Sequence, residues 1–563
     1  MTLSEQDLPL LITLVLLGPL IVCALGVVGL ITPLWQSRWF SRALGWLGVL
    51  ASLISLLGAL ALPLTLPGDA PAINRALGGG DFLLADALSI YFILVVNVIT
   101  FVSSWNAMSF LHSAEPSNRW RSPSAFHLAA QMFHVTMILV PLMNNLVALW
   151  IAMQATTLVS TLLVGFEDTR TSREAAWKYL IITSTGIVFA LLGTMFLTKA
   201  ADSASLLVEA SPPQSVMNWT FLMDHADQLQ QCFFRNDAGQ LQQCLCQDRA
   251  DQIERKPLVL VPLAFLFVLV GYGTKAGLAP MHTWLPDGHG EAPAPISALL
   301  SGVLLKSALY AILRFYTITN AVLGNNSFTS AILLGAAMLS LLIATPFILK
   351  ANRFKRVLAY HSLEHMGIIT FGLGIGGSVA IFGALLHVLN HAVTKALMFM
   401  AFGNIVRSYA GAAPPLAPTE QPTGVLRRMP ITGTLLTLGG LALVGMPPFN
   451  IFMSELIMLW GALERLWNFK SQDYNLAPFG FYLVAVIVLL LTTTMIFAGL
   501  IRHLAGIVLQ PQPDQPRLKE SLSDLFPLGV LMAAVVSFGV WIAPPLAHLL
   551  AQSVAIVCGD NCR

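Results

Sequence analysis

Long apolar runs separated by short polar breaks recur along the whole chain. Each run is close to the roughly 20 residues that an α-helix needs to cross a bilayer. The pattern therefore predicts an all-α polytopic membrane protein with about fourteen transmembrane helices. The predicted spans cover residues 8–32, 43–66, 86–110, 127–143, 145–165, 176–198, 257–276, 293–317, 328–349, 357–376, 378–406, 431–456, 477–501 and 525–551.

Composition supports a membrane protein. The chain is 56% hydrophobic and only 10% charged, whereas soluble proteins carry about a quarter of charged residues. The net charge of +2 gives no reason to expect a nucleic-acid partner. The first residues, MTLSEQDLPLLITLVLLGPL, lack a basic segment, so they predict a first span rather than a cleaved signal peptide.

Lys and Arg are distributed unevenly between alternate loops. If the N-terminus is placed outside, most of them fall on inner loops, as the positive-inside rule requires. We therefore expect both termini to lie outside and the number of spans to be even.

Cysteines gather on the predicted outer face. Three lie in the polar loop 200–256, and two lie at the C-terminus. An oxidising face favours disulfides over free thiols, and the spacing is not typical of a metal site. The possible disulfide cysteines are Cys232, Cys244, Cys246, Cys558 and Cys562.

The stretch 271–314 holds two lysines at membrane depth. Lys275 precedes a turn broken by Pro280 and carrying His282, and Lys306 lies within the next apolar run. Proline unwinds a helix locally, and broken helices are tolerated in membranes where they line a cavity or are buried in protein. Lysines at this depth indicate an ion path, although Lys275 could instead extend its charge to the inner surface.

Ionisable groups recur in later spans. His387, His391 and Lys395 are spaced i, i+4, i+8, which places them on one face of a helix. Histidine titrates near neutral pH, so the face predicts a proton wire, whereas a lone histidine would more often be a hydrogen-bonded core residue. Glu455 follows a second break, at Pro447, and is a candidate for the release of the proton.

Two further polar features have weaker interpretations. His361, Glu364 and His365 match H-x-x-E-H, an inverted zinc-protease pattern. Without an obvious third ligand we interpret them as chance or a helix-end hydrogen-bond network, extending the imidazoles toward His387, and we predict no metal. Gln154 lies mid-span and can bond across helices, but it cannot hold a proton at neutral pH.

Several phrases together resemble a known family. They are VGYGTKAGLAPMHTWLPD, QATTLVSTLLVGF, HSLEHMGI and LNHAVTKALMFMAFGNI. They resemble the antiporter-like membrane subunits of the complex I superfamily, and among these component F of the hydrogenase-4 and formate hydrogenlyase group. The resemblance runs from about Asp86 to beyond Glu455 and implies two inverted five-helix repeats, with broken helices at the seventh and twelfth spans.

The resemblance also implies an organisation into segments. Residues 1–126 would form the N-terminal transmembrane helices, and 127–320 the first antiporter-like repeat, which includes the outer loop 200–256. Residues 321–505 would form the second repeat. The C-terminal loop, helix and cysteine-bearing tail would occupy residues 506–563.

Residue by residue, the resemblance assigns ion transfer to Lys275, Lys306, His387, His391 and Glu455. One position departs from the family, because Gln154 stands where relatives carry the glutamate that pairs with the seventh-span lysine. Either the inner half of the path is weakened or another acid substitutes. The candidates are Glu167, Asp168, Asp287 and Glu291.

We therefore expect a proton- or sodium-translocating subunit of a complex I-like or hydrogenase-4-like assembly in a bacterial cytoplasmic (inner) membrane. It would have no catalytic residues or cofactor of its own, and other membrane and peripheral subunits would carry out the redox reaction. An alternative is a cation-conducting subunit of an inorganic carbon transporter, with a zinc-containing, carbonic anhydrase-like partner. A third is a structural subunit that has lost transport.

Overall fold

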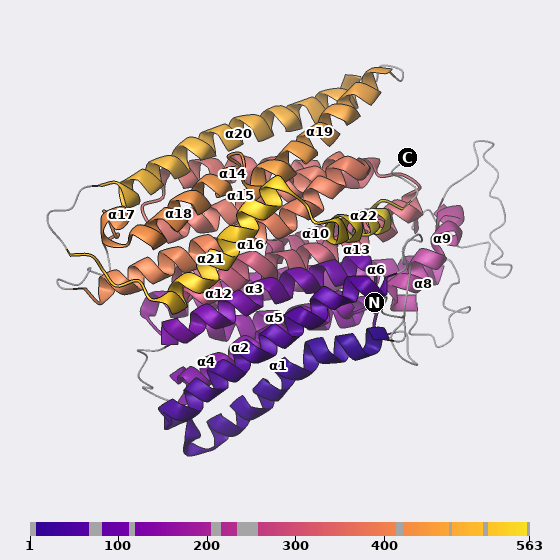
Figure 1. The fold of residues 1–563 in the computed structure, drawn as a ribbon. Helices are drawn as coiled ribbons and strands as arrows, with labels where there is room; N and C mark the ends of the chain where they lie inside the picture. Colours follow the sequence, from indigo (N-terminus) through magenta and orange to yellow (C-terminus); the bar gives the residue numbers. More distant parts are fainter. Residues whose placement is uncertain are drawn as a thin grey trace.

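The computed structural model describes residues 7–66, 82–111, 119–203, 216–233, 257–412, 420–471, 476–510 and 516–559. Within these ranges all regular elements are helical, apart from two isolated β-bridges. The helices form one bundle, with α1 and α2 at one edge and α20 at the opposite edge (Figure 1). The start of α1 and the end of α22 lie at the same end of the bundle, which is also the end that carries α8 and α9.

Most helices begin and end within several residues of the predicted limits of the spans, but the last helix of the twelfth span continues to Ser471, well beyond the predicted end at residue 456. In chain order they are α1 (Leu8–Ile31), α2 (Arg38–Ala61), α3 (Ala87–Leu111), α4 (Pro123–Leu142), α5 (Leu146–Val164), α6 (Arg170–Ser203), α8 (Trp219–Asp224), α9 (Ala226–Phe233), α10 (Pro257–Ala276), α11 (Leu285–Glu291), α12 (Ala294–Leu299), α13 (Leu305–Leu323), α14 (Ser327–Lys350), α15 (Phe354–Ile375), α16 (Gly377–Ala410), α17 (Val425–Arg428), α18 (Pro430–Leu443), α19 (Asn450–Ser471), α20 (Leu476–Val508), α21 (Leu522–Val540) and α22 (Pro544–Cys558).

In the described part of the chain, twelve helical segments are long and apolar enough to cross a membrane. Helix α15 and the pair α18 and α19 occupy the tenth and twelfth predicted spans. The predicted all-α polytopic fold is thus confirmed. The predicted division into repeats stays a prediction, and its limits at residues 126, 320 and 505 fall at or within α4, α13 and α20 rather than between helices.

The two predicted helix breaks are present. Helix α10 ends at Ala276, and Gly277 follows with a left-handed φ of 77°. Helix α18 ends at Leu443, and Gly445 follows with φ 69° before α19 begins. Glycine is suited to such positions because it lacks a Cβ, and the prolines after each glycine prevent the helix from continuing.

Three predicted elements differ from the structure. The last span, 525–551, is split into α21 and α22, because Trp541 is extended and Pro544 starts a new helix. The eighth span contains a five-residue π-turn, Leu300–Leu304. The outer loop 200–256 is partly helical, because α8 and α9 dock on the bundle through Asn218, which accepts a 3.0 Å hydrogen bond from Asn145.

The centre of the bundle is formed by α13, α15 and α16. All of the most apolar part of Ala294–Leu323 is buried, compared with 33% of the corresponding part of α1. An amphipathic distribution is not needed for a central helix, since protein surrounds it on all sides. Polar side chains on these central helices are therefore held in protein rather than at the lipid surface.

Candidate functional site

Lys275 lies at the end of α10 and is fully buried. Its ammonium donates to the backbone carbonyl of Met153 at 2.8 Å, to the hydroxyl of Thr156 at 2.6 Å and to the hydroxyl of Thr157. All three acceptors are neutral oxygens on α5. The break after α10 thus brings the lysine against a neighbouring helix that satisfies its three donors.

Gln154 is on the same helix as these acceptors but makes a different contact. Its amide donates to the hydroxyl of Ser184 on α6 at 3.1 Å. Its carbonyl oxygen is buried without a hydrogen-bond partner among the described residues. The glutamine therefore occupies the predicted position on α5 without bonding to Lys275.

Lys306 follows the π-turn at the start of α13. Its ammonium donates to the carbonyl of Ser301 at 2.6 Å and lies 2.5 Å from Nδ1 of His391 on α16. π-Turns are rare and frequently mark functional sites. The structure thus joins two of the predicted residues, from separate spans, in a direct contact at the centre of the bundle.

The imidazoles of α15 and α16 continue from this contact. The ring centroids of His391 and His365 are 4.7 Å apart, and Nδ1 of His365 lies 3.0 Å from Nε2 of His387. Nδ1 of His387 lies 3.0 Å from the hydroxyl of Ser454 on α19. His365 therefore bridges the two predicted histidines of α16.

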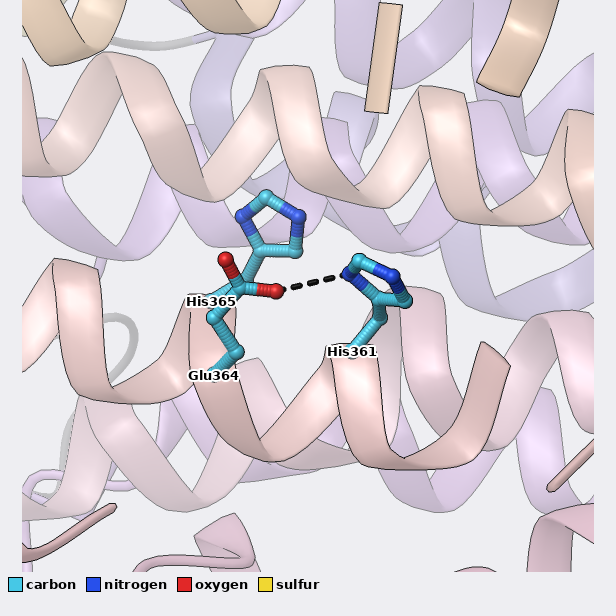
Figure 2. A group of neighbouring side chains, drawn as sticks. All are labelled: His361, Glu364 and His365. Atoms are coloured by element: carbon cyan, nitrogen blue, oxygen red, sulfur yellow. Dashed lines mark hydrogen bonds and ion pairs between the residues drawn. The ribbon is translucent and has the colours of Figure 1, made fainter. Parts of the chain in front are cut away.

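Lys395 lies one helical turn beyond His391. Its ammonium donates to the backbone carbonyl of Leu358 on α15 and lies 5.5 Å from the centroid of the Phe399 ring. The predicted common face of α16 is thus directed at α15 along three turns. Neighbouring α15 supplies His361, whose Nδ1 lies 2.7 Å from a carboxylate oxygen of Glu364 (Figure 2).

Glu455 closes the series at the second helix break. One of its oxygens would lie 2.5 Å from a Cβ placed on Gly445, so a larger residue there would displace the carboxylate from its present position. Ligand-type atoms of His365, His387 and Glu455 lie within 4.8 Å of one another. Glu455 also lines a cavity of about 320 Å³ between α15, α18, α19 and α20.

We call this series the central polar line. Among the described residues, contacts join it from α13 through α16 and α15 to α19, and no hydrogen bond or ring contact extends it to Lys275 or His282. Burial lowers the pKa of His282, which lies in the turn after α10, while a backbone bond to Pro280 acts in the opposite direction. The central polar line consists of Lys306, His391, His365, His387 and Glu455.

The acids proposed to substitute for Gln154 have other partners. Asp168 pairs with Arg121 and lies 3.5 Å from Arg173, and Asp287 pairs with Arg356. Glu291 lies 3.6 Å from Arg353. These pairs neutralise the acids at one end of the bundle rather than beside Lys275.

Glu167 differs from the other three acids. Burial raises the pKa of its carboxyl, and Glu291 acts in the same direction, whereas Lys355 acts in the opposite direction. The proximity of Glu291 and Lys355 places Glu167 in a small charged group between α5, α11 and α15. No contact among the described residues links this group to Lys275.

Sequence reasoning did not identify a buried ion pair between α3 and α13. Both terminal guanidinium nitrogens of Arg314 donate to the carboxylate of Asp86 at 2.7 Å, and both side chains are 1% exposed. Arg314 also lies 4.4 Å from the centroid of the Trp219 ring. An arginine within an apolar run is itself the signal, since such a charge requires a partner.

The predicted cysteines lie mostly outside the described residues. Cys558, at the end of α22, is disulfide-bonded. The side chains of Cys232, Cys244, Cys246 and Cys562 fall outside the part of the chain that the structure describes. Their pairing stays a prediction.

The sequence matches a known protein family and individual relatives. Residues 143–224 and 252–472 match the family described as NADH:quinone oxidoreductase/Mrp antiporter, TM. The hydrogenase-4 component F homolog of Methylacidiphilum infernorum is 36% identical over 433 residues, which cover 75% of this chain and 79% of that protein.

Solved structures share the fold. A chain of the archaeal membrane-bound sulfane sulfur reductase aligns with a TM-score of 0.73 and 21% identity over 97% of both chains. A chain of respiratory complex I from Thermus thermophilus aligns with a TM-score of 0.70 and 20% identity, covering 97% of this chain and all of that one. Because the identities are only 21% and 20%, this likeness shows a shared arrangement of helices and nothing more.

Proposed function

This chain belongs to the NADH:quinone oxidoreductase/Mrp antiporter family of membrane subunits, and from that premise we propose that it transfers protons across the membrane inside a larger assembly. The resemblance found in the sequence motifs is the same family, and the matched region includes Lys275, Lys306, His391 and Glu455. Membership makes the chain an antiporter-like subunit. Which ion it moves, and what drives the movement, are the content of the proposal.

The central polar line carries the proposal. Its five side chains come from four helices, and each lies in hydrogen-bond or ring contact with a neighbour, or within ligand distance of one. Ionisable side chains in the membrane interior are energetically costly, and they therefore usually mark functional sites. A packing role would be served as well by apolar residues, which would not require five mutually adjacent titratable groups.

The chemistry of the line favours H⁺ over Na⁺. Four of its five members offer nitrogen, and amines and imidazoles take up and release protons. Alkali and alkaline-earth cations prefer oxygen ligands, which the line provides only at Glu455. We therefore assign the line to proton transfer, with Lys306 at one end and Glu455 at the other.

We propose further that a partner supplies the energy. The relatives named above are components of hydrogenase-4-like and respiratory complexes. In the same way, a redox reaction in peripheral subunits would drive proton transfer here, in a bacterial cytoplasmic membrane with both chain ends outside. The start of α1 and the end of α22 lie at one end of the bundle, which is compatible with this orientation.

The test is proton transfer by the assembly that copurifies with the tagged chain, reconstituted in vesicles with a pH-sensitive dye inside. Lys306→Ala and His391→Ala each break the first contact of the line, so we expect coupled proton movement to fall to the background level. His134→Gln is the matched control. This buried histidine of α4 bonds to Asn97 at 3.0 Å and lies outside the line.

Assembly is checked for every variant by its elution and subunit content. Normal proton movement in assembled Lys306→Ala and His391→Ala vesicles would refute the proposal. A loss in His134→Gln equal to theirs would also count against it, because the effect would then follow from disturbing any buried histidine.

A further inference from the structure

Two groups of potential metal ligands share the imidazole of His365. One group is His361, Glu364 and His365 on α15, and the other is His365, His387 of α16 and Glu455 of α19. In each group the ligand atoms lie within 4.8 Å of one another. These are the only such groups of His, Cys, Asp and Glu in the described part of the chain.

Three imidazole nitrogens in and beside this cluster are unused. Nε2 of His361, of His365 and of His391 is buried without a hydrogen-bond partner among the described residues. Most buried polar atoms have a partner, so each exception requires an explanation. Ring nitrogens of His134, His282 and His289 also lack a partner among the described residues, but of all these histidines only His361 and His365 belong to a group of ligand-type atoms.

The spacing of the first group suits a single ion. His361, Glu364 and His365 stand at i, i+3 and i+4, so a single helix presents all three side chains on one face. Figure 2 shows them rising from neighbouring turns of α15, with Glu364 joined to His361. Helix α15 is packed against α16 and α14, which limits the movement of these side chains.

We propose that His361, Glu364 and His365 bind one Zn²⁺ ion, and that His387 or Glu455, which are grouped with His365, supplies a fourth ligand. Imidazole nitrogen and carboxylate oxygen are usual zinc ligands, at bond lengths of about 2.0–2.2 Å. The ligand atoms would have to draw together by roughly an ångström around the ion. The proposal differs from our sequence-based expectation, because the motif alone revealed neither the unused nitrogens nor the second group.

The charges around the cluster permit a divalent ion. The carboxylates of Glu364 and Glu455 can offset its two charges, as a buried cation requires. Lys395 of α16 acts electrostatically on Glu364 and competes with the ion for that carboxylate. Glu455 also lines the cavity of about 320 Å³, so the cluster has open space on one side.

The consequence of binding rests on the proposed function. The ion would occupy the nitrogens of His365 and the carboxylate of Glu364, which lie beside or within the central polar line. A bound Zn²⁺ ion excludes a proton from the same atoms. We therefore infer an inhibitory site, at which zinc stops proton transfer.

Binding is measured without any transport, on the purified assembly after treatment with a chelator. Co²⁺ serves as the probe, because its visible absorption reports the number and type of its ligands. We expect one Co²⁺ per chain, displaced by Zn²⁺. Glu364→Gln and His361→Gln each remove a ligand and should weaken binding by about tenfold or more.

His134→Gln is again the matched control. His134 is buried, with one ring nitrogen bonded to Asn97 and the other without a partner in the described part, but it has no ligand group around it. Its binding should equal that of the unmodified chain. The proposal is overturned if the unmodified assembly binds no Co²⁺, or if Glu364→Gln and His361→Gln bind as well as the control.

Transport is then measured in unmodified vesicles with and without Zn²⁺. Inhibition at the concentration that fills the site would support both the site and the path. Binding without inhibition would support the site and contradict the central polar line. Failure of the inference and failure of the proposed function are thus distinguished.

Discussion

At the scale of residues, the contacts of Lys275 are more informative than the substitution at Gln154. The lysine is held by a carbonyl and two hydroxyls of α5, while Gln154 bonds to Ser184 on α6. The oxygens around the ammonium satisfy its hydrogen-bond donors, but because they are uncharged they do not replace the charge interaction that a carboxylate would provide. A proton path that also includes Lys275 would depend on these oxygens.

Two substitutions on α5 separate these roles. Thr156→Val keeps the shape but removes an acceptor from Lys275, and a hydrogen bond to a charged group contributes about 1.5–3 kcal/mol. We expect proton transfer to fall by about tenfold or more, since 1.36 kcal/mol corresponds to a factor of ten. Gln154→Leu removes no bond to the lysine, so transfer should stay within about twofold of the unmodified rate.

Initial rates of proton transfer in vesicles, normalised to assembled chain, measure both effects. If Gln154→Leu abolished transfer while Thr156→Val was harmless, the glutamine and not the hydroxyls would be the functional partner of Lys275.

The residues of the central polar line were only partly predictable. Spacing along one helix placed His387, His391 and Lys395 on one face, because the helical period is fixed. The helix that packs against that face could not be predicted from the spacing of residues. The H-x-x-E-H motif indicates only a chance match or a helix-end network that extends the imidazoles toward His387, since nothing in the sequence states that His365 of α15 packs between two histidines of α16.

At the scale of elements, the second helix break positions Glu455. Gly445 has a left-handed φ of 69°, and the space that a Cβ would need is taken by the Glu455 carboxylate. The breaks were predictable because glycine and proline have fixed conformational consequences. The π-turn in LSGVL was not, because these residues are compatible with an ordinary α-helix.

Gly445→Ala tests whether the break positions the carboxylate. The added methyl would displace Glu455, and the alanine would have to adopt an unfavourable φ. Together these effects should lower the free energy of unfolding by about 1–3 kcal/mol. We expect a lower thermal midpoint and slower proton transfer. Gly506→Ala in α20 is the control, because nothing lies within 4 Å of its Cβ position.

Alanine is favoured over glycine inside a helix, so Gly506→Ala should be neutral or slightly stabilising. Equal midpoints and transfer rates for the two variants would show that Gly445 has no special role. Slow transfer at an unchanged midpoint would still support the positioning of Glu455.

At the scale of the whole molecule, apolar patterning predicted the helices but not their order in space. The number and length of spans follow from the thickness of the bilayer. The arrangement depends on contacts between distant segments, such as Asp86 and Arg314, which are 228 residues apart. In the sequence, each member of such a pair appears only as a single charge in its own stretch, and nothing nearby identifies its partner.

The ion pair joins several parts of the bundle. Asp86 accepts from the backbone of Ser89 at the start of α3, and Arg314 donates to the hydroxyl of Tyr310, which bonds to a carbonyl of α4. Trp219 of α8 stacks on the same guanidinium. Groups from four helices, α3, α4, α8 and α13, therefore meet around this ion pair.

For this reason, Asp86→Asn should lower the free energy of unfolding of the whole bundle. Asparagine keeps the oxygen that accepts from Ser89 but leaves Arg314 charged and buried without a counter-ion, and breaking a buried pair costs about 3–5 kcal/mol. Glu174→Gln, which breaks an exposed pair with Lys178, should cost below about 1 kcal/mol. Thermal midpoints of the detergent-purified chains compare the two, and a midpoint for Asp86→Asn as high as that for Glu174→Gln would mean that the bundle does not depend on the pair.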